Sequence, residues 1–213
     1  MNTFIINGSP RGKAGNTELF IRQFIAGMST PPEVGYAAGA DPSELAENAA
    51  GYTTLLVFMP LYVHAMPGIV LKFFEKLKPA APGQRMGFVV QAGFIEGAQA
   101  RFLKRYCGLL AERLGYDYLG MVTKGDAAGV SMLPDFFSRK LFRLLNTLGR
   151  RYEETGRFDE AAAAELAGTY QLSKNEARLY GFLAGIGVSH IFWKKFWRDN
   201  GVSGRGMDRP FLA

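Results

Sequence analysis

The sequence predicts a doubly wound α/β domain, in which helices cover both faces of one parallel β-sheet. Five short apolar runs alternate with helical patterns between residues 3 and 122. Within several of these runs, apolar residues stand at consecutive positions, as in Leu55 to Met59, which is typical of parallel strands buried on both faces. The chain has 213 residues, 48% of them hydrophobic, which is enough for one such domain with a large core.

The elements can be placed in chain order from hydrophobic periodicity and turn residues. Strands are expected at residues 3–7, 33–37, 53–59, 86–91 and 118–122. Helices are expected from residue 16 to the prolines at 31–32, and at 41–48, 66–77 and 97–114. Asp41 is expected to cap the second helix, because a proline follows it and Glu44 stands three residues later. Five strands in this pattern favour an open doubly wound sheet over a barrel.

Beyond residue 130 the pattern becomes helical throughout, with helices expected at residues 134–152, 159–170 and 173–198. Ser173 and Glu176 form a capping-box pattern at the start of the last one. We therefore expect a core at residues 1–130 and a helical extension at 131–213. The extension would pack on the core or at a dimer interface, within a single domain overall.

Charge and cysteine content narrow the function. The net charge is +6, but no run of basic residues exceeds two, so nucleic acid is not an expected partner. An anionic small molecule and a plain solvated surface both remain open. The single cysteine, Cys107, excludes an internal disulfide, a thiolate metal cluster and a CxxC pair. The N-terminus shows no secretory signal pattern, so a cytoplasmic location is expected.

The loop after the first strand carries the clearest chemical signal. Residues 8–17 read Gly-Ser-Pro-Arg-Gly-Lys-Ala-Gly-Asn-Thr and join a strand to a helix N-terminus, where free backbone N–H groups favour an anion. Because glycine has no side chain, the three glycines of this loop allow a ligand to approach the backbone closely. Hydrogen-bond donors and cations are available from Ser9, Arg11, Lys13, Asn16 and Thr17. A phosphate site is favoured over the alternative of a solvated turn with Asn16 as a simple N-cap.

Two loops together resemble a known family. Gly8-Ser9-Pro10-Arg11 with Gly15-Asn16-Thr17, and the loop Pro60 to Pro67 followed by Lys72 to Glu75, resemble the phosphate and flavin loops of the NADPH-dependent FMN reductase and NAD(P)H:quinone oxidoreductase superfamily. The resemblance covers roughly residues 1–125. It implies a flavodoxin-like fold, FMN as cofactor, NAD(P)H as co-substrate and a homodimer.

The resemblance also implies roles for individual residues. The FMN phosphate would be held by Ser9, Arg11, Asn16 and Thr17. The isoalloxazine would be lined by Pro60, Leu61, Tyr62 and Val63, and its pyrimidine side bordered by Gln91, Gly93 and Phe94. Residues 91–94 depart from the hydroxyl- and glycine-rich version common in the family. Ordinary packing at a strand end is the competing interpretation for Tyr62 and Phe94.

Other reactive side chains are few. His64 lies in the flavin-type loop and is a weak candidate for proton donation, with a surface histidine as the commoner outcome. His190 lies in an apolar stretch and is expected to be structural, and Cys107 is expected to be a small core residue. No residue spacing indicates a metal site, and a lone cysteine excludes the iron–sulfur branch of the family.

These observations favour an FMN-dependent NAD(P)H oxidoreductase that passes hydride through flavin to a quinone, free flavin, nitro or azo acceptor. A non-enzymatic electron carrier or flavin-binding protein and a scaffold without FMN are the alternatives. The carrier would be expected to have an acidic face, which a basic chain does not offer. The last helix is apolar and aromatic, but its uncharged run, Leu179 to Trp193, is too short to span a bilayer. Packing or dimerisation is favoured for it over contact with a membrane surface.

Overall fold

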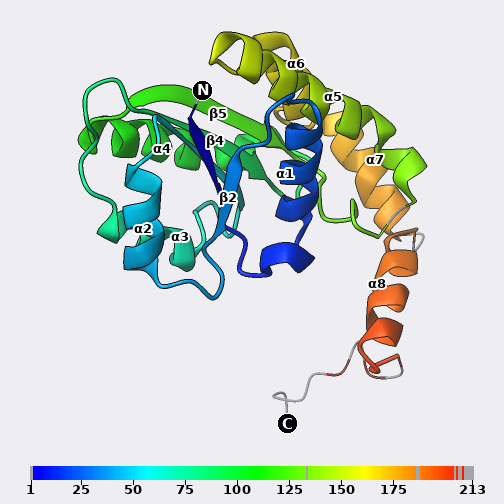
Figure 1. Cartoon of the computed structure of the whole chain (residues 1–213). Coiled ribbons are helices and arrows are strands. Elements are labelled where there is room, and N and C mark those ends of the chain that lie inside the picture. The colour runs from blue at the N-terminus through cyan, green and yellow to red at the C-terminus, as the bar shows by residue number, and fades with distance from the viewer. Residues whose placement is uncertain (1, 133, 186–187, 204, 206–207, 209–213) are drawn as a thin grey trace. The chain divides into compact units, whose positions relative to one another are not determined.

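The computed structural model describes residues 2–132, 134–185, 188–203, 205 and 208, with only the backbone described for 135 and 188–192. The side chain of His190 therefore lies outside the described part. The chain divides into two compact units, Met1–Gln171 and Leu172–Ala213. The sheet and helices α1 to α6 belong to the first unit, and α7 and α8 to the second (Figure 1).

The described residues of the first unit form one all-parallel, five-stranded sheet, as expected from the sequence, and the strand order is β2-β1-β3-β4-β5. Its strands are β1 (Thr3–Asn7), β2 (Glu33–Tyr36), β3 (Thr54–Pro60), β4 (Arg85–Gln91) and β5 (Asp117–Lys124). The chain moves outward from β1 to β2 and then returns past β1 to β3. This change of direction defines a topological switch point at the carboxyl ends of β1 and β3, where ligands bind in open α/β sheets.

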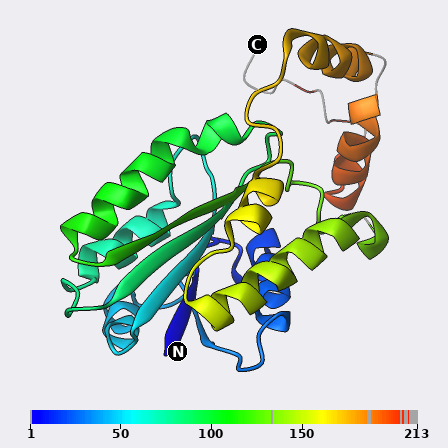
Figure 2. The same cartoon turned by 90° about the horizontal axis from the view of Figure 1, so that it is seen from above.

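Helices cover both faces of the sheet (Figure 2). Their bounds are α1 (Asn16–Ala26), α2 (Pro42–Ala50), α3 (Gly68–Lys76), α4 (Arg101–Arg113), α5 (Asp135–Thr155) and α6 (Glu160–Ala167). The alternation of side chains along a strand divides the core in two: Leu55 and Val57 pack with α2, α3 and α4, whereas Leu56 and Phe58 pack with α1, α5 and α6. The continuous apolar pattern of β3 is thus explained by burial on both faces.

Helix α5 is part of this layered unit because its backbone approaches α1 closely. A side chain at Gly149 would collide with the carbonyl of Phe24, and one at Gly27 with the carbonyl of Asn146. The Asn146 amide also donates to the Gln23 carbonyl oxygen at 2.6 Å. The compact unit consequently extends to residue 171, whereas the sequence analysis placed the start of the extension at residue 131.

Helix ends agree with the capping signals. The Asp41 carboxylate accepts from the backbone N–H groups of Ser43 and Glu44 at 2.7 and 3.1 Å. In the second unit, the Ser173 N–H donates to Glu176 at 2.8 Å and the Glu176 N–H donates to Ser173 Oγ at 3.3 Å. This reciprocal pair is the capping box expected from the sequence.

One expected helix differs from the structure, and another contains residues outside the described part. The segment expected to be helical from residue 97 begins as a 3₁₀ helix, η2 (Gly97–Ala100), before α4. The helix expected at 173–198 is described as two, α7 (Lys174–Gly185) and α8 (Val188–Asp199), separated by residues outside the described part. Glycines at 181 and 185 lower the helix propensity of this segment. No helix of the described chain has both the length and the hydropathy needed to cross a bilayer.

Candidate functional site

The loop after β1 is held in shape by short internal hydrogen bonds. The Ser9 N–H donates to Asn7 Oδ1 at 3.0 Å, and the Gly12 N–H donates to the Ser9 carbonyl at 2.9 Å. The Arg11 N–H donates to Ser9 Oγ at 3.2 Å. Gly12 has a φ of +51°, a conformation that most other residues adopt only with strain. The loop is therefore preorganised.

Gly15 places the start of α1 beside this loop. It is the N-cap of α1 and offers no side-chain cap, so the N–H groups of the first turn are left for a ligand. A Cβ at this position would lie 2.7 Å from Ser9 Oγ and 3.3 Å from Arg11 Cβ. A side chain here would fill the space between the helix start and the loop. Asn16, considered above as a simple N-cap, is instead the first residue of the helix.

A buried polar network supports the loop from below. Asn7 is fully buried at the end of β1, and its Nδ2 donates to Glu18 Oε2 at 3.1 Å and to the Gly12 carbonyl at 3.4 Å. Glu18, 6% exposed, also pairs with Arg22 at 3.0 Å. The sequence analysis did not single out Asn7 or Glu18. Asn7 could have been recognised in the sequence, because it is the polar last residue of an otherwise apolar strand.

Asn16 and Thr17 connect α1 to neighbouring loops. Asn16 Nδ2 donates to the carbonyl oxygens of Ala127 and Ala128 at 2.7 and 3.3 Å, which ties the helix start to the loop after β5. Gln91 Nε2 donates to Thr17 Oγ1 at 2.5 Å, which ties α1 to the end of β4. Two of the four side chains expected to hold a phosphate, those of Asn16 and Thr17, are thus bonded to other parts of the chain.

The loop after β3 has a different construction. Tyr62 and Ala65 exchange two backbone hydrogen bonds of 3.0 Å, which closes a two-residue turn over Val63 and His64. Both turn residues have positive φ, +47° and +65°. This is the pattern of a type I′ turn, which Asn and Gly adopt readily and a β-branched residue such as valine does not. His64 Nδ1 lies 3.0 Å from the Gln99 carbonyl oxygen, so its ring ties the turn to η2.

Most of the expected residues line one cavity of about 240 Å³ at the switch point. Its lining consists of Ser9, Arg11, Gly15, Asn16, Thr17, Pro60, Leu61, Tyr62, Gln91, Ala92, Gly93, Ala127 and Ala128. Val63, His64 and Phe94 do not line it; Val63 and Phe94 are 93% and 69% exposed. Ala127 and Ala128, in the loop after β5, were missed because only the loops after the first, third and fourth strands were searched.

Two buried acceptors in this cavity lack partners. Among the described residues, Asn16 Oδ1 and Gln91 Oε1 are buried side-chain oxygens without a hydrogen-bond donor. Both residues line the same cavity. A buried acceptor without a partner costs about 1–3 kcal/mol, so this pair is suited to a ligand that brings hydroxyl or N–H donors.

The charged side chains of the loop after β1 are cationic. Arg11 lines the cavity, and Lys13 lies in the same loop with its Nζ 5.1 Å from the centre of the Tyr36 ring. At the end of β5, burial lowers the pKa of Lys124, while Asp126 opposes this shift. Burial raises the pKa of the Cys107 thiol to about 12, which keeps it protonated and unreactive in the core. The described residues include no group of three or more His, Cys, Asp or Glu side chains that could hold a metal ion.

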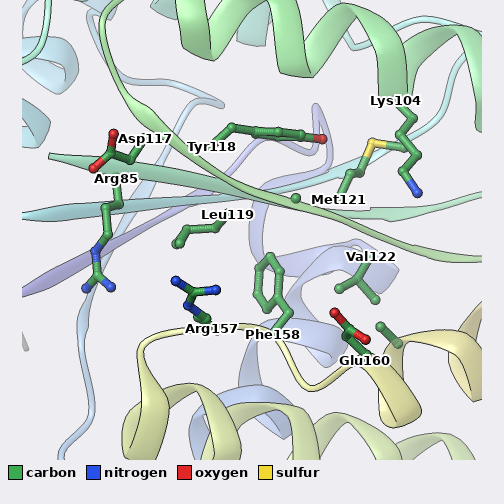
Figure 3. Close-up of a pocket in the computed structure, with 12 residues that line it drawn as sticks. Arg85, Lys104, Asp117, Tyr118, Leu119, Met121, Val122, Arg157, Phe158 and Glu160 are labelled. Atoms are coloured by element: carbon green, nitrogen blue, oxygen red, sulfur yellow. The ribbon is translucent and has the colours of Figure 1, made fainter. Parts of the chain in front are cut away.

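A second cavity, of about 550 Å³, follows the outer edge of β5 (Figure 3). Arg85, Lys104 and Arg157 border it together with Asp117 and Glu160, so both signs of charge are present. Arg85 donates to the Gly156 carbonyl and to Thr54 Oγ1 at 3.1 and 3.0 Å, which gives it a structural role. This cavity shares no residue with the one at the switch point and has no glycine-rich loop at a helix start.

The strand order and the position of the first cavity define a flavodoxin-like α/β protein with a candidate phosphate-binding site at its switch point. No family model matches the sequence, and no curated protein matches it. Solved structures of the same fold match this chain. A NADPH-quinone reductase from P. pentosaceus has 17% identity and a TM-score of 0.53, over 72% of this chain and 98% of that one. An FMN-dependent NADH-azoreductase from Bacillus anthracis, in complex with FMN, has 14% identity and a TM-score of 0.53, over 72% and 100%.

A third neighbour, an NADH:FMN oxidoreductase in its apo form, has 14% identity and a TM-score of 0.55, over 82% of this chain and 98% of its own. The three neighbours are NAD(P)H-linked reductases of the kind that the sequence motifs indicate. At 14–17% identity the likeness shows a common fold, and the resemblance found in the sequence is confirmed at that level.

Proposed function

We propose that this chain is an FMN-dependent NAD(P)H oxidoreductase that delivers electrons to a small acceptor such as a quinone, free flavin, nitro or azo compound. One observation carries the proposal. At the switch point, a cation, an uncapped helix N-terminus and two unpartnered amide oxygens line the same cavity. The first two suit an anion, and the oxygens suit a ligand with hydroxyl donors.

The phosphate of FMN would lie at the loop after β1. Ser9 Oγ, the Arg11 guanidinium, the Thr17 hydroxyl and the first backbone N–H groups of α1 are the donors that remain, because Thr17 Oγ1 only accepts a bond from Gln91, whereas the Asn16 amide donates to Ala127 and Ala128. Asn16 and Thr17 would also hold the helix start in position and offer their backbone N–H groups. Hydrogen bonds to a charged group are worth about 1.5–3 kcal/mol each, so this cluster would supply much of the affinity.

The remainder of FMN fits the other features of the site. Ribityl hydroxyls can donate to Asn16 Oδ1 and Gln91 Oε1, the two oxygens without partners. The cavity of about 240 Å³ is smaller than the roughly 300–1,000 Å³ of pockets that enclose a whole ligand. Part of the ligand would therefore lie over the mouth of the cavity, beside Tyr62, which lines the cavity and is 46% exposed.

The reaction needs few side chains of the protein. When bound, FMN supplies an electron-accepting ring that takes hydride from a nicotinamide and passes the electrons on. Pro60, Leu61, Tyr62 and Val63 would orient the ring, while Gln91, Gly93 and Phe94 would border its far edge. His64 is held at the Gln99 carbonyl, which supports a positioning role rather than proton transfer. We also propose a homodimer, as the resemblance implies.

The experiment compares FMN with riboflavin, which lacks the phosphate. Wild-type protein should bind FMN more tightly than riboflavin in a fluorescence titration. Arg11→Gln should weaken FMN binding about fivefold, as expected for one exposed ionic contact of about 1 kcal/mol, and should leave riboflavin binding unchanged. Lys13→Gln is the matched control, because Lys13 does not line the cavity. Equal affinity for both flavins would place the phosphate elsewhere.

Turnover separates an enzyme from a carrier. The FMN-loaded protein should consume NADPH or NADH continuously with menadione as acceptor. A flavin-binding carrier would retain the yellow cofactor without steady nicotinamide consumption. Protein that binds neither flavin would contradict the proposal altogether.

A further inference from the structure

The second unit, residues 172–213, combines positive charge with exposed aromatic side chains. This unit contains seven Lys and Arg residues and three Asp and Glu residues, so its net charge is +4. The whole chain has a net charge of +6, and the unit makes up about a fifth of the chain. Among the described side chains of α7, none is buried, and Phe182 is 64% exposed. In α8, Trp193 is 55% exposed and Phe196 is 41% exposed. Exposed aromatic clusters mark interaction surfaces.

Helix α8 separates these two properties around its axis. With about 100° per residue, Trp193, Phe196 and Trp197 share one face. The Trp193 and Phe196 rings are 5.9 Å apart, centre to centre. Lys195 lies on the opposite face, where it forms an ion pair of 2.5 Å with Asp199. Lys194 lies beside the aromatic face, about 60° from Trp197, and Arg198 lies about 100° from Trp197, toward the side of the helix that carries Lys195.

The flanking cations are available for a partner. Among the described residues of this unit, ion pairs join Lys195 to Asp199 and Arg205 to Asp208, and none includes Lys194 or Arg198. Lys194 and Arg198 line an open hollow of about 500 Å³ together with Trp197 and Ser203. Two unpaired cations and a serine hydroxyl around a hollow suit a phosphate group.

We propose that the second unit docks on an anionic phospholipid surface. The face formed by Trp193, Phe196 and Trp197 would enter the boundary between head groups and acyl chains, and Lys194 and Arg198 would contact lipid phosphates. An amphipathic helix with aromatic residues on one side and cations on the other binds membranes in this way. No described helix can cross the bilayer, so the contact is with its surface.

The charge of the molecule favours this partner over two others. The first unit, residues 1–171, has a net charge of +2, and a second copy of the chain repeats the same excess. Neither net positive charge complements a unit that itself carries +4, whereas an anionic bilayer does.

Trp193 and Trp197 provide the test, since the sequence contains two tryptophans and both lie in α8. Intrinsic tryptophan fluorescence of the intact protein thus reports on α8 without a label. Vesicles of phosphatidylcholine with about a third phosphatidylglycerol should shift the emission to shorter wavelength and carry the protein upward in a flotation gradient. Pure phosphatidylcholine should do neither, and high salt should reverse the shift.

Charge reversal gives the decisive comparison. The double variant Lys194→Glu, Arg198→Glu should lower the partition coefficient at least tenfold, because two cations near the surface become anions. The double variant Lys104→Glu, Arg105→Glu changes the net charge equally but lies in α4, and it should bind as the wild type does. The readout does not involve flavin, so it is independent of the proposed reaction.

Three results would overturn the proposal. The first is equal binding to neutral and anionic vesicles, and the second is equal loss of binding in both double variants. The third is an emission that is already that of buried tryptophan without vesicles and does not respond to them. In that case a second copy or the first unit covers the aromatic face, and light scattering of the intact protein would show which.

Discussion

The two loops that meet at the switch point are built on opposite principles. The loop after β1 is fixed by hydrogen bonds from Asn7, Ser9 and Gly12, and it rests on the buried Glu18. The loop after β3 is a short turn in which Val63 is almost fully exposed and has positive φ. Charged groups are bound best by donors that are already in place, whereas an exposed turn can adapt to a ligand's shape. In the proposed function, the hydrogen-bonded loop would bind the phosphate, and the more exposed turn, the adaptable loop, would contact the ring.

The largest effect is expected from breaking the support of the hydrogen-bonded loop. Asn7→Ala removes three hydrogen bonds and leaves the Glu18 carboxylate and the Ser9 N–H with fewer partners. Buried polar groups without partners cost about 1–3 kcal/mol each, so the free energy of unfolding should fall by about 2–4 kcal/mol. Urea denaturation measures this change. Asn48→Ala, which removes an exposed amide bonded to Glu33 at 3.1 Å, should cost less than about 1 kcal/mol. Similar losses in both variants would mean that Asn7 is not a support.

A smaller effect is expected from cutting the connections between loops. Replacing both Asn16 and Thr17 with alanine removes the bonds to Ala127, Ala128 and Gln91. FMN affinity should fall at least tenfold while circular dichroism stays native, because a displaced helix start weakens charged hydrogen bonds worth roughly 1.5–3 kcal/mol each. Thr17→Ser keeps the hydroxyl and should retain the wild-type affinity. If the double alanine variant also binds FMN normally in a titration, the connections have no role in the site.

The smallest effect, of opposite sign, is expected in the adaptable loop. Val63→Asn places a residue that tolerates positive φ in the turn and should raise the free energy of unfolding by about 0.5–1 kcal/mol. The same substitution at Val202, an exposed valine without positive φ, is the control and should leave stability nearly unchanged. Thermal denaturation compares them. A loss of stability at position 63 would show that the turn is not strained. If the turn adapts to flavin, stiffening it should also change FMN binding.

Much of the first unit followed from local sequence. The apolar run of β3 and the Asp41 cap predicted elements that the structure contains, because burial on two faces and helix capping leave a direct trace in residue type. The phosphate-type loop could also be recognised, since its glycines and donors are contiguous. The helix expected at 173–198 is described as α7 and α8, and the residues between them lie outside the described part.

The sequence by itself determined the class of sheet, the order of its elements and which residues could meet an anion, because these depend on patterns within a few residues. Only the tertiary structure decided which partners the side chains of those residues have within the chain. Asn16 and Thr17 were expected to face a phosphate, yet their side chains bond to Ala127 and Gln91, more than seventy positions away. A side chain's partner depends on which strands become neighbours, and long-range contacts of this kind leave no periodic trace in the chain.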